Sequence, residues 1–197
     1  YSNGMRYSAK HKAQNHENIL SVAARSFRKH GGSSGIGTVM KKTGLTKGGF
    51  YRHFRSKDDL FVGAVARAVD EAGKAMVEVA RSAPEGQALR AIIERYLSAS
   101  HAKSMGTGCA FSALGPEFAR KPLPVRKRIE ALLEEYRERL LPFIPGQTRE
   151  ERLMKCRLLF PSMAGALMMA RVTASPQRRE QMLMEARNFF IKCFAEE

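Results

Sequence analysis

The chain has 197 residues, of which 44% are hydrophobic and 27% charged, a balance that is ordinary for a globular protein and argues against wholesale disorder. The formal net charge of +15 favours a polyanionic partner, either nucleic acid or an anionic membrane surface. The longest apolar run, at 163–170, is far shorter than the roughly 20 residues of a membrane span, so we expect no membrane partner. The three cysteines are widely spaced, which argues against a disulfide framework and a CxxC-type zinc site. We therefore predict a cytoplasmic protein without metal or cofactor.

The first 60 residues hold a disproportionate share of the positive charge. They contain 12 Lys and Arg residues but only 3 Asp and Glu residues. A basic segment is most often a solvated surface, but this one also carries a pattern typical of DNA-reading proteins. Nucleic acid is therefore the favoured partner.

Almost the whole chain is predicted to be helical, because Ala, Leu, Met, Glu, Arg and Lys dominate and alternating strand patterns are absent. The first helix is expected over 12–30 and ends at a glycine pair, and the second is expected over 36–43 and stops at Gly44. Thr46 is a suitable N-cap for a short third helix.

The rest of the chain continues as longer helices. Ser56 is expected to cap a helix over 57–81, since Asp58 and Asp59 follow in its first turn. Glycines and prolines then separate five further helices, expected over 85–103, 108–118, 124–141, 149–173 and 176–194. The predicted fold class is all-α, with about nine helices.

Residues 36–54 meet the physical demands of a helix–turn–helix. Gly44 tolerates the positive φ of a tight turn. The inward positions are apolar: Ile36, Val39, Leu45, Phe50 and Phe54. The outward positions hold donors, cations and small residues: Thr46, Lys47, Gly48, Gly49, Tyr51 and His53. The two glycines each cost a helix about 1 kcal/mol relative to alanine, which is explained if the backbone approaches DNA closely. The alternative is that they form a simple loop.

The stretch 18–61 resembles the DNA-binding domain of the TetR (tetracycline-repressor-like) family of bacterial one-component transcription regulators. The matching residues are Ile19, Leu20, Ala23, Ala24, Phe27, Gly31, Val39, Met40, 43–54 and 56–60. The resemblance implies that phosphates are contacted by Thr46, Lys47, Tyr51 and Lys57, that Lys47, Gly48 and Gly49 lie nearest the bases, and that His53 is a further backbone contact. The alternatives are that Tyr51 is a half-buried core ring and His53 a packed histidine.

One loop departs from the family pattern. The segment 31–35 is one residue shorter than usual and consists only of glycine and serine. The sequence leaves open how this loop anchors the helix that follows it.

One helix–turn–helix reads only a few base pairs, so we expect a two-fold dimer with recognition helices about 34–36 Å apart. We divide the chain into an N-terminal helix–turn–helix domain of three helices, 1–56, and a helical ligand-sensing and dimerisation domain, 57–197. As the resemblance implies, the last two helices would form an intermolecular four-helix bundle. The expected interface residues are Met163, Gly165, Leu167, Met168, Met182, Ala186, Phe189 and Phe190. Alternatively, these residues complete the core of a monomer.

The middle helices are expected to enclose an effector pocket for a hydrophobic small molecule. Candidate lining residues are Tyr96, Met105, Cys109, Phe111, Leu114, Phe118, Leu133 and Tyr136, each of which also suits an ordinary core. The segment 106–117 resembles the Gly-Cys segment of one group of TetR-family regulators, some of which respond to electrophiles or oxidants through a cysteine. A helix N-terminus favours the thiolate form of a cysteine. For Cys109 we nevertheless favour the role of a small buried side chain.

We expect no enzymatic activity. Residues 31–35 match the GxSxG pattern, but that nucleophile turn needs a preceding strand, and a helix is predicted there. The predicted function is a one-component transcriptional regulator, a repressor by the habit of the family, that binds a palindromic operator as a homodimer. A small molecule or thiol modification would release it. The rival interpretation is an architectural DNA-binding protein without effector control.

Overall fold

The computed structural model describes residues 3–32 and 34–196, apart from the side chains of residues 3–9 and Lys47. All regular secondary structure in this described part is helical, as predicted. The α-helices are α1 (Asn3–His30), α2 (Ile36–Lys42), α3 (Lys57–Ser82), α4 (Ala88–Tyr96), α5 (Ala99–Lys103), α6 (Ala110–Ala119), α7 (Leu123–Leu140), α8 (Arg149–Val172) and α9 (Pro176–Phe194). Two short 3₁₀ helices, η1 (Lys47–Arg52) and η2 (Leu141–Phe143), complete the order.

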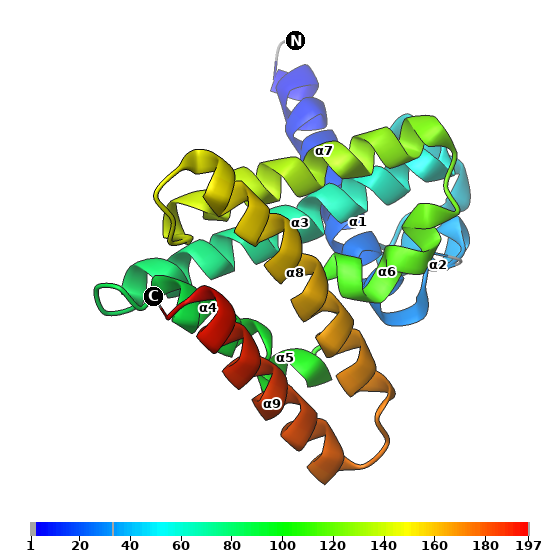
Figure 1. The fold of residues 1–197 in the computed structure, drawn as a ribbon. Helices are drawn as coiled ribbons and strands as arrows, with labels where there is room; N and C mark the ends of the chain where they lie inside the picture. Colours follow the sequence, from blue (N-terminus) through cyan, green and yellow to red (C-terminus); the bar gives the residue numbers. More distant parts are fainter. Residues whose placement is uncertain (1–2, 33, 197) are drawn as a thin grey trace.

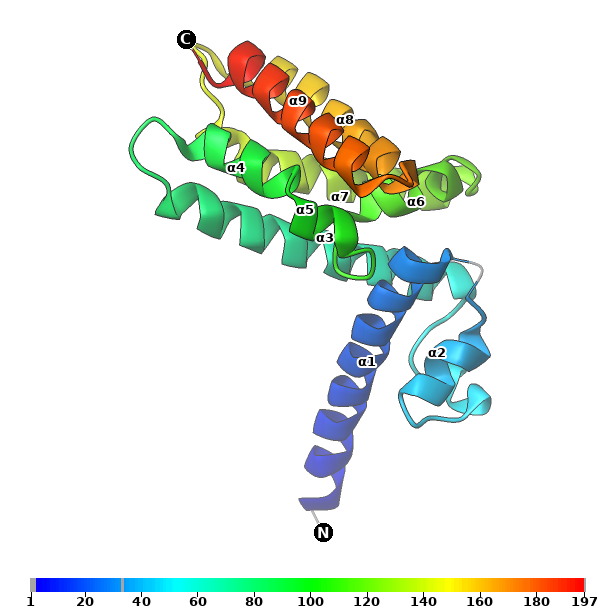
Figure 2. The ribbon, with the colours of Figure 1, turned by 90° about the horizontal axis from the view of Figure 1, so that it is seen from below.

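The helices form a large body from which α1 projects. Within the body, α3 runs beside α7, and α8 packs along α9 (Figure 1). The N-terminal half of α1 is straight and extends away from this body, and α2 lies beside the C-terminal half of α1 (Figure 2). Together, α1, α2 and η1 form a small N-terminal lobe. Because α1 also packs against α3 and α6, this lobe is held to the body at the C-terminal end of α1.

Several helix ends lie where the sequence predicts them. Gly31 and Gly44 have φ values of +80° and +72°, which glycine adopts without steric cost. Ser56 caps α3, since its Oγ accepts a hydrogen bond from Asp59 N–H at 3.0 Å. The bounds of α9 are those expected, and Ser175 caps its first turn.

The helix expected over 85–103 is wrong, because the chain breaks into α4 and α5 there. Ser98 Oγ accepts a hydrogen bond from His101 N–H at 3.2 Å and so starts a new helix. The His101 ring bonds through Nδ1 to Tyr96 O at 2.6 Å, which satisfies one carbonyl at the end of α4. A buried histidine thus stabilises a break that helical periodicity does not reveal.

The first and third predicted helices also differ in detail. α1 begins at Asn3 rather than at residue 12, in a polar stretch that has no apolar stripe to indicate a helix. The segment after Thr46 is a 3₁₀ helix rather than an α-helix, and the Thr46 side chain makes no capping hydrogen bond. The two glycines disfavour a regular α-helix in this segment.

Candidate DNA-binding interface and regulatory core

The helix η1 is anchored by buried aromatic rings and presents its other side to solvent. Phe50 and Phe54 are buried with ring centroids 5.6 Å apart, and Phe54 stacks on His16 of α1 at 4.6 Å. Tyr51 lies between them in sequence and is 74% exposed. Tyr51 is therefore not the half-buried core ring of the alternative interpretation.

Gly48 stands in open space on this surface. A Cβ placed there would meet no heavy atom within 4 Å, and one at Gly49 would meet only Thr46 Oγ1 at 3.7 Å and Met40 Cε at 3.9 Å. Neither glycine has a positive φ. Neither the backbone conformation nor packing within the subunit therefore requires glycine at position 48.

Two of the other predicted contacts, Thr46 and Lys57, are exposed at the starts of η1 and α3. Lys47 begins η1, but its side chain lies outside the described residues. His53 is half-buried, and its Nδ1 lacks a hydrogen-bond partner within the described part of the chain. Burial, followed by the nearby charges of His16, Lys12 and Arg52, lowers the pKa of His53 from its ordinary value.

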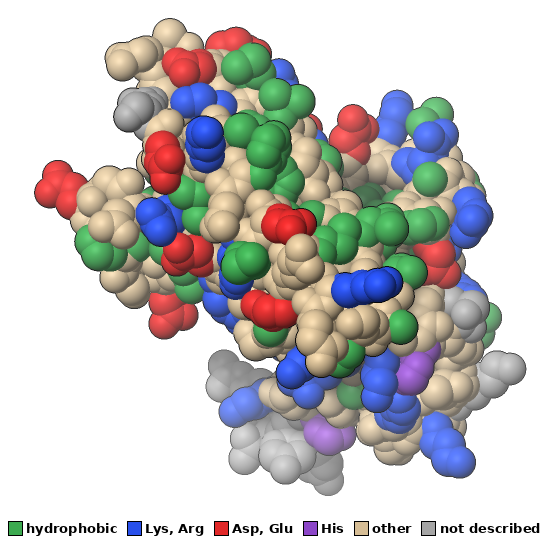
Figure 3. Space-filling view, turned by 60° about the horizontal axis from the view of Figure 1, so that its bottom comes forward, with side chains coloured by type: hydrophobic (Ala, Val, Ile, Leu, Met, Phe, Trp, Pro, Cys, Tyr) green, Lys and Arg blue, Asp and Glu red, His purple; other side chains and the backbone are tan. Residues whose placement is uncertain are grey.

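The acidic residues of the first 60 positions are all paired with cations from later in the chain. The pairs are Glu17 with Arg67, Asp58 with Lys121, and Asp59 with Arg128. They leave the lysines and arginines of the N-terminal lobe uncompensated by carboxylates of that lobe. In Figure 3, Lys, Arg and His side chains gather at the lower edge of the molecule, with most Asp and Glu side chains above them. This surface has the charge that a nucleic-acid backbone requires.

Cys109 precedes α6 and contacts a buried polar cluster. Its backbone N–H donates to His101 Nε2 at 3.0 Å, while His101 Nδ1 bonds to Tyr96 O. The ring is therefore the neutral Nδ1–H tautomer. Burial, with a further contribution from Arg171, lowers the pKa of His101 to about 4.

Arg171 of α8 completes this cluster. Its guanidinium donates to Ser112 Oγ at 2.9 Å and to the carbonyls of His101 and Ala102 at 3.3 Å, without an ion-pair partner among the described residues. The sequence did not point to His101 or Arg171, because polar residues are common in α5 and α8 and the contacts of these two arise only from tertiary packing.

The candidate lining residues do not form one site. Tyr96, Leu114 and Tyr136 are buried core side chains, and Met105 is exposed on a loop. Burial and the neighbouring Cys109 raise the pKa of the Tyr96 hydroxyl well above its ordinary value. Phe111, Phe118 and Leu133 instead line a cavity of about 370 Å³ between α6 and α7.

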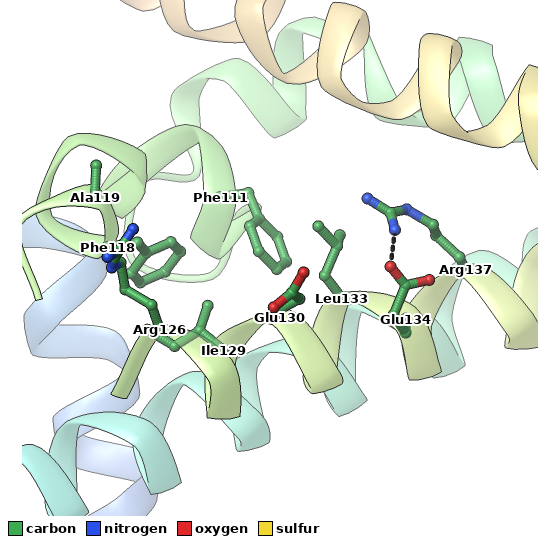
Figure 4. A pocket seen from close by; sticks show the side chains of 9 residues that line it. All are labelled: Phe111, Phe118, Ala119, Arg126, Ile129, Glu130, Leu133, Glu134 and Arg137. Carbon is green, nitrogen blue, oxygen red and sulfur yellow. Dashed lines mark hydrogen bonds and ion pairs between the residues drawn. The ribbon is translucent and has the colours of Figure 1, made fainter. Parts of the chain in front are cut away.

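Both apolar and charged side chains of α6 and α7 line that cavity (Figure 4). Its remaining lining residues are Ala119, Arg126, Ile129, Glu130, Glu134 and Arg137. Phe111 and Phe118 meet edge to face with centroids 5.5 Å apart, and Arg137 pairs with Glu134. The cavity is open to solvent and has the size of a small-molecule site.

The predicted interface residues on α8 and α9 fall into three groups. Met163 and Leu167 are fully buried within the subunit, and Phe190 nearly so. Met168 and Phe189 are exposed, while Gly165, Met182 and Ala186 are partly buried. Further large apolar side chains are exposed on these two helices: Met154, Leu158, Met169, Val172 and Met184.

Among the described residues, α8 is the one helix long and apolar enough to cross a membrane. Length and composition alone do not distinguish a membrane span from a core helix of a soluble protein. Here α8 packs against α5, α6, α9 and η2.

Comparison with known families accounts for both parts of the molecule. Residues 19–64 match the profile of bacterial regulatory proteins of the tetR family, and residues 86–185 match that of the tetracyclin repressor-like C-terminal domain. The second match alone covers more than half of the chain. The chain belongs to the TetR family. Members of this family are DNA-binding regulators rather than enzymes, and they usually act as dimers that bind ligands.

Solved structures of TetR-family regulators share the fold at low sequence identity. E. coli NemR in its reduced form is 20% identical, with a TM-score of 0.71, over 93% of this chain and 98% of that one. A TetR regulator from Chloroflexus aurantiacus is 22% identical, with a TM-score of 0.74, over 95% and 100%. One from Cytophaga hutchinsonii is 13% identical, with a TM-score of 0.75, over 94% and 98%. No curated protein matches the chain.

Proposed function

We propose that this TetR-family regulator is a homodimeric repressor that binds a palindromic operator through η1 and is released by a small molecule or by modification of Cys109. The observation that carries the proposal is Gly48, which has no structural reason to be glycine within the subunit and lies on an exposed, basic surface. A missing side chain at such a position allows the backbone to approach a base edge or a phosphate.

The residues that we propose contact DNA are chosen from this surface and from the family resemblance. Tyr51, Thr46 and Lys57 are exposed around Gly48 and Gly49 and would bind phosphates. Lys47 is included on the resemblance alone. His53 is better suited to packing than to a phosphate contact, because burial and neighbouring cations disfavour its charged form.

The dimer proposal rests on apolar residues found on two sides of α8. One side is buried in the subunit core, whereas Leu158, Met168 and Val172 are exposed on the other side. Phe189 is likewise exposed on α9. An exposed apolar patch of this kind is typical of a protein–protein interface, so a second subunit is the natural cover. Two copies would then present two η1 segments to one operator, with 1–56 as the DNA-binding domain of each.

For effector control we propose two routes that converge on α6. The cavity between α6 and α7 would take a small molecule, and Cys109 at the start of α6 would react with an oxidant or electrophile, as in the Gly-Cys group. Either event would change the packing of α6 and shift the balance between two orientations of the DNA-binding lobes. The protein would act in the cytoplasm, where its DNA lies.

The decisive experiment is selection of bound DNA from a random pool, with and without hydrogen peroxide. We expect a palindrome whose binding weakens steeply with salt and is abolished by Tyr51→Ala, while that variant keeps the wild-type melting temperature. Recovery of no preferred sequence would instead indicate an architectural DNA-binding protein.

The same selected DNA tests the thiol route. If peroxide releases the protein, Cys109→Ser should resist release, whereas Cys193→Ser, which removes an exposed thiol on α9, should respond like the wild type. Equal release of both variants would contradict the role of Cys109.

A further inference from the structure

Among the described residues, one hydrogen bond joins the short loop between α1 and α2 to the regulatory domain. The backbone N–H of Gly32 donates to Glu117 Oε2 of α6, with an N···O distance of 2.7 Å. These residues lie 85 positions apart in the chain. A hydrogen bond to a carboxylate is about twice as strong as one between neutral groups, so this contact is a substantial link between the two parts.

The unusual composition of the loop makes the link possible. A Cβ at position 32 would lie 2.6 Å from Phe61 Cε2 and 2.8 Å from Glu117 Oε2, distances at which atoms must move apart. A side chain at position 32 would therefore require the Phe61 ring, the Glu117 carboxylate or the loop to move. Glycine at this position thus lets the Glu117 carboxylate come within hydrogen-bond distance of the backbone.

The link adjoins the cavity between α6 and α7. Phe118 follows Glu117 in sequence and lines the cavity. Its ring centroid lies 6.0 Å from that of Phe61, which in turn lies 5.5 Å from that of Phe27 in α1. Because close-packed interiors rearrange between discrete states rather than deform continuously, a shift of α6 must be accommodated along this series of contacts.

We propose that Glu117 is a positioning residue for DNA binding, which holds the loop, and with it α2 and η1, in the orientation that binds DNA and releases them when the cavity is filled. This inference rests on the proposed function. Apparent affinity for DNA scales with the fraction of protein in the competent orientation, so loss of the link weakens binding without removing any contact to DNA.

The first test is the affinity of Glu117→Ala for a DNA fragment recovered in the selection. We expect about ten-fold weaker binding, the change that loss of one hydrogen bond to a charged group produces in an equilibrium constant. Glu117→Gln keeps an acceptor and should lie between this variant and the wild type. The matched control is Glu135→Ala, which removes the same charge from an exposed position on α7, outside the cavity lining, and no hydrogen bond or ion pair within the described residues. Unchanged or tighter binding by Glu117→Ala, or an equal loss in the control, would overturn the inference.

A double-mutant cycle tests whether the two residues act through one bond. Gly32→Ala should also weaken binding, and the double variant should bind no more weakly than the weaker single variant. If the fold-loss of DNA affinity in the double variant equals the product of the two single losses, the two residues act separately. Thermal melting of each variant shows whether it is folded.

A further variant tests whether filling the cavity releases the loop and η1 from the orientation that binds DNA. Leu133→Trp fills part of the cavity and should weaken DNA binding in the wild-type background but add nothing in the Glu117→Ala background. No effect in the wild type, or equal effects in both, would contradict release through Glu117.

Hydrogen exchange at the Gly32 amide provides a measurement that needs no DNA. We expect a protected amide in the wild type and faster exchange in Glu117→Ala. A wild-type protein that selects no DNA would contradict the proposed function itself. Selective binding that Glu117→Ala leaves unchanged would contradict this inference alone.

Discussion

The glycines of this protein differ in the space around them: at some positions a Cβ would clash with neighbouring atoms, and at others it would meet none. At Gly108 a Cβ would lie 2.5 Å from Arg171 Nη2 and 2.8 Å from the backbone oxygen of Ser104, so the fold itself excludes a larger residue. At Gly48 the space is empty. Both segments stand out in the sequence, but only the structure separates a glycine needed for packing from one available for binding.

This difference predicts opposite effects of alanine at position 48 on stability and on binding. Gly48→Ala should leave the free energy of unfolding unchanged or raise it by about 0.4–1 kcal/mol, since alanine restricts the unfolded chain and meets no clash. DNA affinity should fall, because the methyl group occupies the proposed interface. Chemical denaturation and a mobility-shift titration of the same preparations check both. A variant that binds DNA as well as the wild type would remove the main support for the interface.

Among the elements, the break between α4 and α5 shows how one buried side chain overrides local propensity. The residues of 85–103 suit a continuous helix, yet Ser98 and His101 end one helix and start another through contacts with the chain itself. His101 also accepts a hydrogen bond from the Cys109 backbone, which ties α5 to the start of α6. Such a site depends on the neutral imidazole.

Acid should therefore weaken this part of the fold. The pKa of His101 is about 4 in the folded protein, below its ordinary value of 6.5, so the unfolded chain takes up the proton first as the pH falls. The contribution of His101 to the free energy of unfolding is constant above pH 6.5 and falls by about 3 kcal/mol between pH 6.5 and 4.

The measurement is the difference in unfolding free energy between the wild type and His101→Gln as a function of pH. Carboxylates titrate in both proteins and cancel, so the difference should narrow as the pH falls through this interval. A difference that stays constant from pH 7 to 4 would show that His101 does not titrate as described.

Across the whole molecule, α8 has more apolar surface than one subunit buries. Leu159, Met163 and Leu167 are inside, while Leu158 and Met168 are outside on the same helix. The sequence predicts that α8 and α9 form an interface but does not distinguish these two sides of α8, because both carry similar residues. The exposed side is the part available to a second subunit.

Phe189→Glu should convert the proposed dimer to a monomer and reduce operator binding by at least ten-fold, since two half-sites would no longer be bound together. Phe189 is 62% exposed in the subunit, so the charge should not unfold it. Leu123→Glu is the matched control, because Leu123 is 55% exposed on α7, outside the proposed interface. Sedimentation of both variants checks the result, and a wild-type protein that sediments as a monomer would contradict the dimer.

The helical class, the turn at Gly44, the cap at Ser56, the bounds of α9 and the basic N-terminal segment all follow from the sequence alone, because each depends on residues close together in the chain. Three features became visible only once the helices were packed: which apolar residues are interior, that Phe111 and Phe118 line a cavity while Tyr96 and Tyr136 do not, and that Gly32 donates a hydrogen bond to Glu117. Periodicity and capping are local properties and do not report on such contacts. A cavity, an exposed apolar side and a bond across 85 residues exist only once distant helices have packed together.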